Sequence, residues 1–145
     1  MDYMFLIYSN EAQMAQMTDE ERRTTISKHW AIKDEATSLG VFKGASRLEV
    51  AASAVSVRAD QGKVMMTDGP YAETKETLAG YYMIDCKDLE DAKYWAGRLA
   101  QTACGAVVEL RPLRATPGRD CWRSRLAVRR GARSVPSPDR SGPRR

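Results

Sequence analysis

Apolar positions along the first 113 residues repeat with the periods of short strands and helices. Residues Tyr3–Tyr8 form a continuous apolar run of strand length, with β-forming residues at both ends. Such a run is typical of a strand that is covered on both faces. We therefore expect this segment to be a central strand of a sheet.

A long helix is predicted over Asp19–Leu39. Thr18 and Glu21 have the spacing of a capping box, and Gly40 suits the position that follows a helix. The side of the helix expected to be buried carries Ile26, Trp30 and Thr37.

The remaining elements follow from the same two periods. A second helix is expected after a cap at Asp88, because Leu89, Ala92, Ala96 and Leu99 recur at helical spacing. Further strands are expected at Val41–Val50, Ala54–Ala59, Lys63–Thr67, Gly80–Asp85 and Val107–Leu110.

The predicted order of elements, β-α-β-β-β-β-α-β, is typical of the α+β class. It matches a ferredoxin-like antiparallel sheet with two helices on one face and an extra hairpin in the middle. Two helices can cover only one face of this sheet, yet its first strand is apolar on both sides. A second copy of the chain is expected to cover the other face, so we predict a homodimer.

The loop between the hairpin and the next strand has an unusual composition. Residues Asp68–Glu76 read DGPYAETKE, whereas a hairpin needs only a two-residue turn. In one interpretation Asp68 only caps the turn, and Glu73 and Lys75 belong to an ordinary polar loop. In the other, the stiff turn holds Asp68 and Lys75 in a cleft, where charged groups act best when they are fixed.

Three segments resemble the DGPF subgroup of the YCII-related family: Tyr3–Tyr8, Asp68–Glu76 and Gly80–Asp85. The loop is close to the subgroup's DGPFAETKE, with Tyr71 in place of Phe. The similarity covers residues 1–113, which we interpret as one domain, and does not extend into residues 114–145.

The resemblance implies a dimeric ferredoxin-like α/β barrel with a small pocket between sheet and helices. In related proteins a histidine near the first helix and an aspartate before the fifth strand are the suspected acid/base pair, which here implicates His29 and Asp68. Some relatives act on chlorinated aromatic intermediates. The DGPF subgroup is often encoded beside sigma factors of the extracytoplasmic-function class, which implies a functional link to such a factor.

His29 is the only histidine of the chain. It could be a packed, hydrogen-bonded residue beside Trp30, or a proton carrier, since the ordinary pKa of imidazole is about 6.5. Tyr81 and Tyr82 alternate across one strand, so one is expected at the pocket or dimer seam and the other under a helix. Together with Lys75 and Glu73, these tyrosines are the candidate ligand-binding residues.

Charge is distributed unevenly along the chain, whose formal net charge is +4. Residues 1–113 hold 13 Lys and Arg against 17 Asp and Glu, and residues 114–145 hold 10 Arg against two Asp. This tail is rich in Arg, Pro, Gly and Ser without apolar periodicity, so we expect it to be disordered. It could contact nucleic acid non-specifically, but no nucleic-acid-binding motif accompanies it.

Several other chemistries lack their motifs. The three cysteines have no paired or zinc-type spacing, and the sequence contains no glycine-rich phosphate loop, HExxH or GxSxG motif. We therefore predict no metal and no cofactor. The apolar run at the N-terminus is too short for a signal peptide or a membrane span, so we expect a cytoplasmic protein without membrane contact.

Two main functions remain open. The chain could be a small-molecule-binding protein with lyase-type or isomerase-type acid/base chemistry at His29 and Asp68. Alternatively, it could be a non-catalytic ligand-binding or partner-binding module in a sigma-factor circuit. The sequence does not decide whether the protein is an enzyme.

Overall fold

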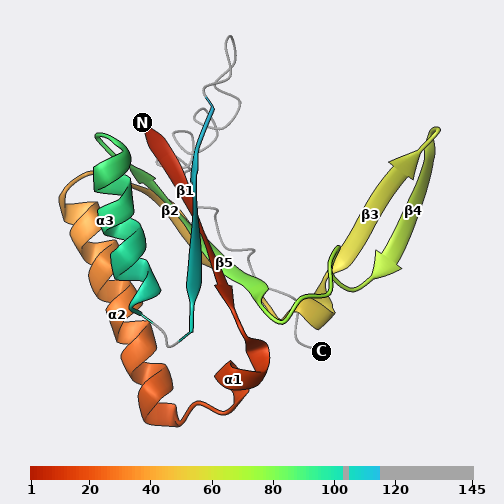
Figure 1. Ribbon diagram of the computed structural model, residues 1–145, viewed down its shortest axis with the longest axis horizontal. Coiled ribbons are helices and arrows are strands. Elements are labelled where there is room, and N and C mark those ends of the chain that lie inside the picture. The colour runs from red at the N-terminus through yellow and green to blue at the C-terminus, as the bar shows by residue number, and fades with distance from the viewer. Residues whose placement is uncertain (103–104, 115–145) are drawn as a thin grey trace, which may run out of the picture. The chain divides into compact units, whose positions relative to one another are not determined.

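Two separate antiparallel sheets and three α-helices form the part of the chain that this computed structural model describes, residues 1–102 and 105–114 (Figure 1). In chain order the elements are β1 (Asp2–Ser9), α1 (Glu11–Ala15), α2 (Asp19–Ser38), β2 (Phe42–Arg47), a 3-10 turn (Ala51–Ser53), β3 (Val55–Asp60), β4 (Lys63–Asp68), β5 (Thr77–Asp85), α3 (Leu89–Ala100) and β6 (Val107–Pro112). The predicted order is confirmed, and the short helix α1 and the 3-10 turn are additions to it.

The main sheet has the strand order β2-β5-β1-β6, and every neighbouring pair is antiparallel. Helices α2 and α3 pack on one face of this sheet (Figure 1). Strands β3 and β4 pair only with each other and form the extra hairpin. This arrangement is a mixed α+β fold and is consistent with the ferredoxin-like plan.

Strand β1 alternates between a buried and a half-buried face. Tyr3, Phe5 and Ile7 lie under the helices and belong to the core, where Phe5 is fully buried. Met4 and Leu6 lie on the opposite face and are only partly buried in one chain. The described residues therefore cover the first face of β1 fully and the opposite face only in part.

Helix α2 begins as predicted and turns a different side to the core. Its capping box is present, with the Glu21 backbone N–H donating to Thr18 Oγ1 and the Thr18 backbone N–H donating to the Glu21 carboxylate. The core residues are Ile32 and Ala36, so the predicted buried side of Ile26, Trp30 and Thr37 is wrong.

The apolar residues on the predicted side of α2 border a cavity instead of the core. Ile26 and Trp30 are 43% and 55% exposed, and both line that cavity. Thr37 is exposed and donates a hydrogen bond to the backbone oxygen of Lys33. Helical spacing locates a stripe on the helix, but it does not say whether core or cavity lies opposite.

Residues Met1–Leu113 form one compact unit. The predicted disorder of residues 114–145 lies outside the described residues, except for Arg114, and stays a prediction. Among the described residues, no helix has both the length and the apolar character needed to cross a membrane.

Candidate functional site

His29 and Tyr82 form a hydrogen-bonded pair between α2 and β5. Tyr82 is buried in the core, and its Oη atom lies 3.1 Å from His29 Nδ1. The Tyr82 hydroxyl also lies 3.3 Å from the backbone oxygen of His29, to which it can donate. The two rings are stacked, with centroids 5.9 Å apart. The alternation of β5 directs Tyr82 toward the helix, and α2 presents His29 above it.

A cavity of about 390 Å³ lies beside this pair, within the volume range of small-molecule sites. We call it the His29 cavity. Its walls come from α1, α2, β1, β2 and β5 and are mostly apolar, including Ile7, Ile26, Trp30, Ala45 and Tyr82.

Burial and a nearby cation perturb the two polar groups of this site. Burial lowers the pKa of His29, and the positive charge of Arg47 lowers that pKa further. Burial raises the pKa of Tyr82. Both shifts favour the uncharged forms, the neutral imidazole of His29 and the intact phenol of Tyr82.

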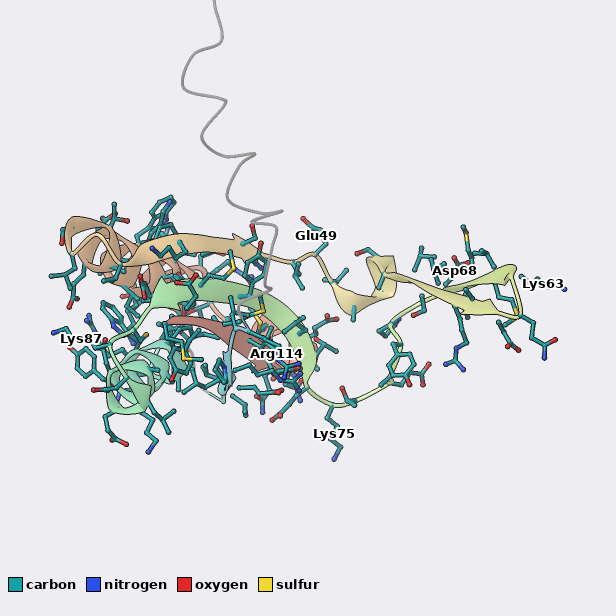
Figure 2. The ribbon with its side chains drawn as sticks, turned by 90° about the horizontal axis from the view of Figure 1, so that it is seen from above. Glu49, Lys63, Asp68, Lys75, Lys87 and Arg114 are labelled. Carbon is teal, nitrogen blue, oxygen red and sulfur yellow. The ribbon has the colours of Figure 1, made fainter. Side chains whose placement is uncertain are left out.

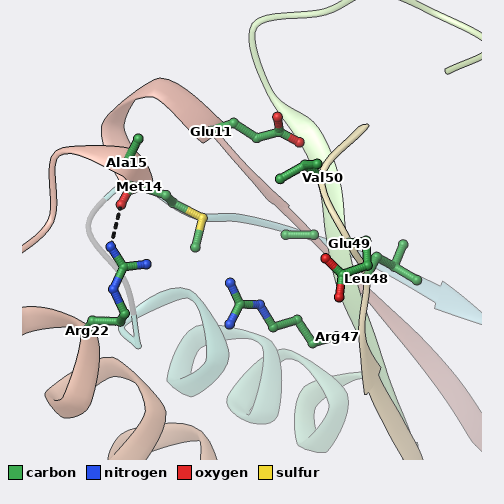
Figure 3. A pocket seen from close by; sticks show the side chains of 9 residues that line it. Glu11, Met14, Ala15, Arg22, Arg47, Leu48, Glu49 and Val50 are labelled. Atoms are coloured by element: carbon green, nitrogen blue, oxygen red, sulfur yellow. Dashed lines mark hydrogen bonds between the residues drawn. The ribbon is translucent and has the colours of Figure 1, made fainter. Parts of the chain in front are cut away.

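A second cavity, of about 370 Å³, adjoins the first and is shown in Figure 3. We call it the Glu11 cavity. It shares Met14, Arg22, Arg47 and Ala79 with the His29 cavity. The Arg22 side chain hydrogen-bonds the backbone oxygen of Met14, and Figure 3 shows the Arg47 side chain extending toward Arg22.

The predicted loop residues lie apart from this cavity. Asp68 ends β4 on the hairpin and Lys75 lies in the connection to β5 (Figure 2). Asp68, Glu73 and Lys75 are all exposed, and none of them lines either cavity. Within the chain, His29 and Tyr82 are brought together, Tyr81 joins the cavity lining, and the loop charges are not brought to it.

Asp68 does not act as a turn cap in this structure. Its carboxylate makes no hydrogen bond and no ion pair with any described residue. The turn is held instead by Gly69, which has a φ of 101°: its backbone N–H donates to the Ala54 oxygen, and its backbone oxygen accepts from Ser56 Oγ.

Sequence reasoning missed Arg22 and Arg47 as site residues. They come from α2 and β2, and no local motif connects them. For Arg22, the sequence did contain one signal. Arg22, Ile26, His29 and Lys33 are spaced three or four residues apart, which places them along one side of a helix. Within the described part of the chain, no three His, Cys, Asp or Glu side chains are grouped to hold a metal ion.

Comparisons with known proteins identify a family and one relative. Residues 1–114 match the YCII-related domain. An uncharacterized protein of Rhizobium meliloti (strain 1021) is 33% identical over 113 residues, which cover 77% of this chain and 90% of that relative. Residues 1–114 include every residue that lines the His29 cavity.

Proposed function

The chain belongs to the YCII-related family, and we propose that it binds a small molecule in the His29 cavity. The observation that carries this proposal is a mostly apolar cavity of about 390 Å³ with one hydrogen-bonded polar pair in its wall. A concave apolar site with a few converging polar groups is the usual form of a small-molecule site.

The His29–Tyr82 pair supports acid/base chemistry in this cavity. The Tyr82 hydroxyl has one proton, so both of its contacts with His29 are hydrogen bonds only if Nδ1 carries a proton and donates to Oη. In that tautomer Nε2 keeps its lone pair, and the lowered pKa keeps the ring neutral. A neutral imidazole with a free lone pair can accept a proton from a bound molecule in a lyase or isomerase reaction.

We propose that the chain belongs to the DGPF subgroup and that the loop Asp68–Glu76 is a second part of the site. In this proposal Asp68 is an acceptor or base, and Lys75 and Glu73 contact the ligand. The carboxylate of Asp68 pairs with no described residue, which supports this role, because a turn cap would use that carboxylate within the turn.

A homodimer with a barrel-like pairing of sheets is proposed from two uncovered apolar surfaces. The outer face of the main sheet presents Met4, Leu6, Tyr81 and Met83, which lie opposite one another in register. One face of the hairpin carries exposed apolar residues: Val55, Val57, Ala59, Val64 and Met66. An isolated two-stranded hairpin has little stability in water, so a partner that covers it is favoured.

The alternative is a non-catalytic regulatory module linked to an extracytoplasmic-function sigma factor in the cytoplasm. The separation of Asp68 from the His29 cavity within one chain favours this alternative, because the proposed acid/base partners do not meet there. In this function the cavity binds a signal molecule, and His29 only shapes it.

A cavity-filling variant tests the proposed function. A panel of small aromatic fragments is screened against the full chain by ligand-observed NMR, and the hits are repeated with Ala45→Leu and Ala31→Leu. Ala45 lines the cavity, so its enlargement should weaken the hits by about tenfold or more. Ala31 is exposed on α2 outside the cavity, and its variant should bind like the wild type.

Two outcomes of this screen decide between the functions. Hits that bind Ala45→Leu as tightly as the wild type would exclude the cavity as the site. If the cavity is confirmed, His29→Gln should keep binding in both functions, and it should abolish turnover of a substrate only if the protein is an enzyme.

A further inference from the structure

Two arginine side chains stand at the boundary between the His29 cavity and the Glu11 cavity. Arg22 projects from α2 and Arg47 from the end of β2, and each lines both cavities. Figure 3 shows Arg22 near Met14 and Ala15, and Arg47 extending toward Arg22 from the segment that carries Leu48 and Glu49. A molecule in the His29 cavity therefore meets both guanidinium groups at one end.

The charges around the His29 cavity have one sign. Arg22, Lys33 and Arg47 line it, and no Asp or Glu does so among the described residues. Within the same part of the chain, neither Arg22 nor Arg47 forms an ion pair with a carboxylate. The cavity thus presents net positive charge to its occupant.

Among the described residues, the two nearby carboxylates form no ion pair with Arg22 or Arg47. Glu11 and Glu49 line only the Glu11 cavity. Glu11 is already committed, because it accepts hydrogen bonds from the Ala51 backbone N–H at 2.7 Å and from Thr77 Oγ1 at 3.1 Å.

The hydrogen-bonding capacity of the two arginines is also largely unused. The Arg47 side chain makes no hydrogen bond with the described residues. Arg22 makes two contacts of 3.5 Å, to the backbone oxygens of Met14 and Met17, which orient it without exhausting its donors. Planar guanidinium groups with free N–H donors are well suited to bind carboxylate oxygens in pairs.

We propose that the His29 cavity takes a small apolar carboxylate, with its hydrocarbon body against Ile26, Trp30 and Tyr82 and its carboxylate between Arg22 and Arg47. This inference rests on the proposed function, because it names the ligand class of the same cavity. The apolar walls select the body of the ligand, and the two arginines select its charge and its orientation.

The experiment compares a carboxylate with its neutral amide on one ring system. Binding of 1-naphthoate and 1-naphthamide, and of the smaller benzoate and benzamide, to the full chain is measured by isothermal titration calorimetry at neutral pH and constant salt. In each pair the carboxylate should bind about tenfold more tightly, since the two ligands differ mainly in the charge-assisted hydrogen bonds.

Arginine variants test whether the preference for carboxylates over amides arises from the two arginines between the cavities. Arg47→Met keeps much of the apolar stem and should reduce the preference toward equal binding, while Arg47→Lys should retain part of it. Arg23→Met is the matched control, because Arg23 is exposed on α2 and lines neither cavity. Its preference should equal that of the wild type.

The outcomes separate this inference from the proposed function. Equal or tighter binding of the amides would overturn the carboxylate class and leave the cavity as a small-molecule site. A carboxylate preference that persists in Arg47→Met would overturn the placement between the two arginines. Absence of binding for all four probes, together with no fragment hit in the cavity, would overturn both proposals.

Discussion

At the scale of residues, one ring nitrogen of His29 is hydrogen-bonded and the other has no partner among the described residues. Nδ1 contacts Tyr82, and Nε2 makes no hydrogen bond with the described residues. Burial and Arg47 both disfavour the imidazolium form. The pKa of His29 therefore depends on its burial and on the charge of Arg47.

This environment predicts the titration of His29. Its pKa should lie below the ordinary value of about 6.5, and it should move upward in Arg47→Met, because the variant removes a cation that opposes protonation. As the chain has one histidine, its ring signals in a proton NMR titration need no further assignment. A pKa that is unchanged in Arg47→Met would show that the arginine does not approach the ring.

At the scale of elements, Gly80 allows β2 and β5 to approach closely beside the cavity. A Cβ atom at Gly80 would lie 2.7 Å from the backbone oxygen of Ser46, and Gly80 pairs with Arg47 in the sheet. The position of Arg47 therefore depends on the absence of a side chain at Gly80.

The same substitution at two glycines should have opposite effects on stability. Gly80→Ala should lower the free energy of unfolding by about 1–3 kcal/mol, because backbone must move to relieve the clash. Gly97→Ala lies inside α3 with nothing within 4 Å of the added Cβ, and it should stabilise the chain by roughly 0.5–1 kcal/mol. Urea denaturation measures both; a neutral Gly80→Ala would contradict the close strand approach.

Most elements were predictable because their signals are local. The capping box of α2, the cap at Asp88 and the strand periods need only neighbouring residues. The short helix α1 had such a signal too, since Asn10 accepts a hydrogen bond from the Gln13 backbone N–H, but five residues give little periodicity. The buried side of α2 could not be predicted, because it depends on where the core ends and the cavity begins.

The candidate site was predictable only in part. His29, Tyr81 and Tyr82 were named from the sequence and line one cavity. Arg22 and Arg47 reach that cavity from separate elements, and only the folded chain brings them together. The roles of Asp68, Glu73 and Lys75 stay predictions, since the loop lies outside the cavity of its own chain.

At the scale of the whole molecule, the uncovered sheet face and hairpin predict a dimer. Light scattering after size exclusion at micromolar concentration should give twice the mass of one chain. Leu6→Glu places a charge on the outer sheet face and should reduce the mass to that of one chain, while Ser27→Glu on the exposed side of α2 should not. A wild-type monomer would contradict the barrel-like pairing.

The central claim is that a small molecule binds beside His29, and a nuclear Overhauser measurement tests it most directly. The full chain is saturated with whichever naphthyl probe binds more tightly, and contacts from the naphthyl protons to the histidine ring protons are recorded. Direct contacts to His29 and a shift of its ring signals are expected. Saturable binding with no contact to His29 and no shift would contradict it.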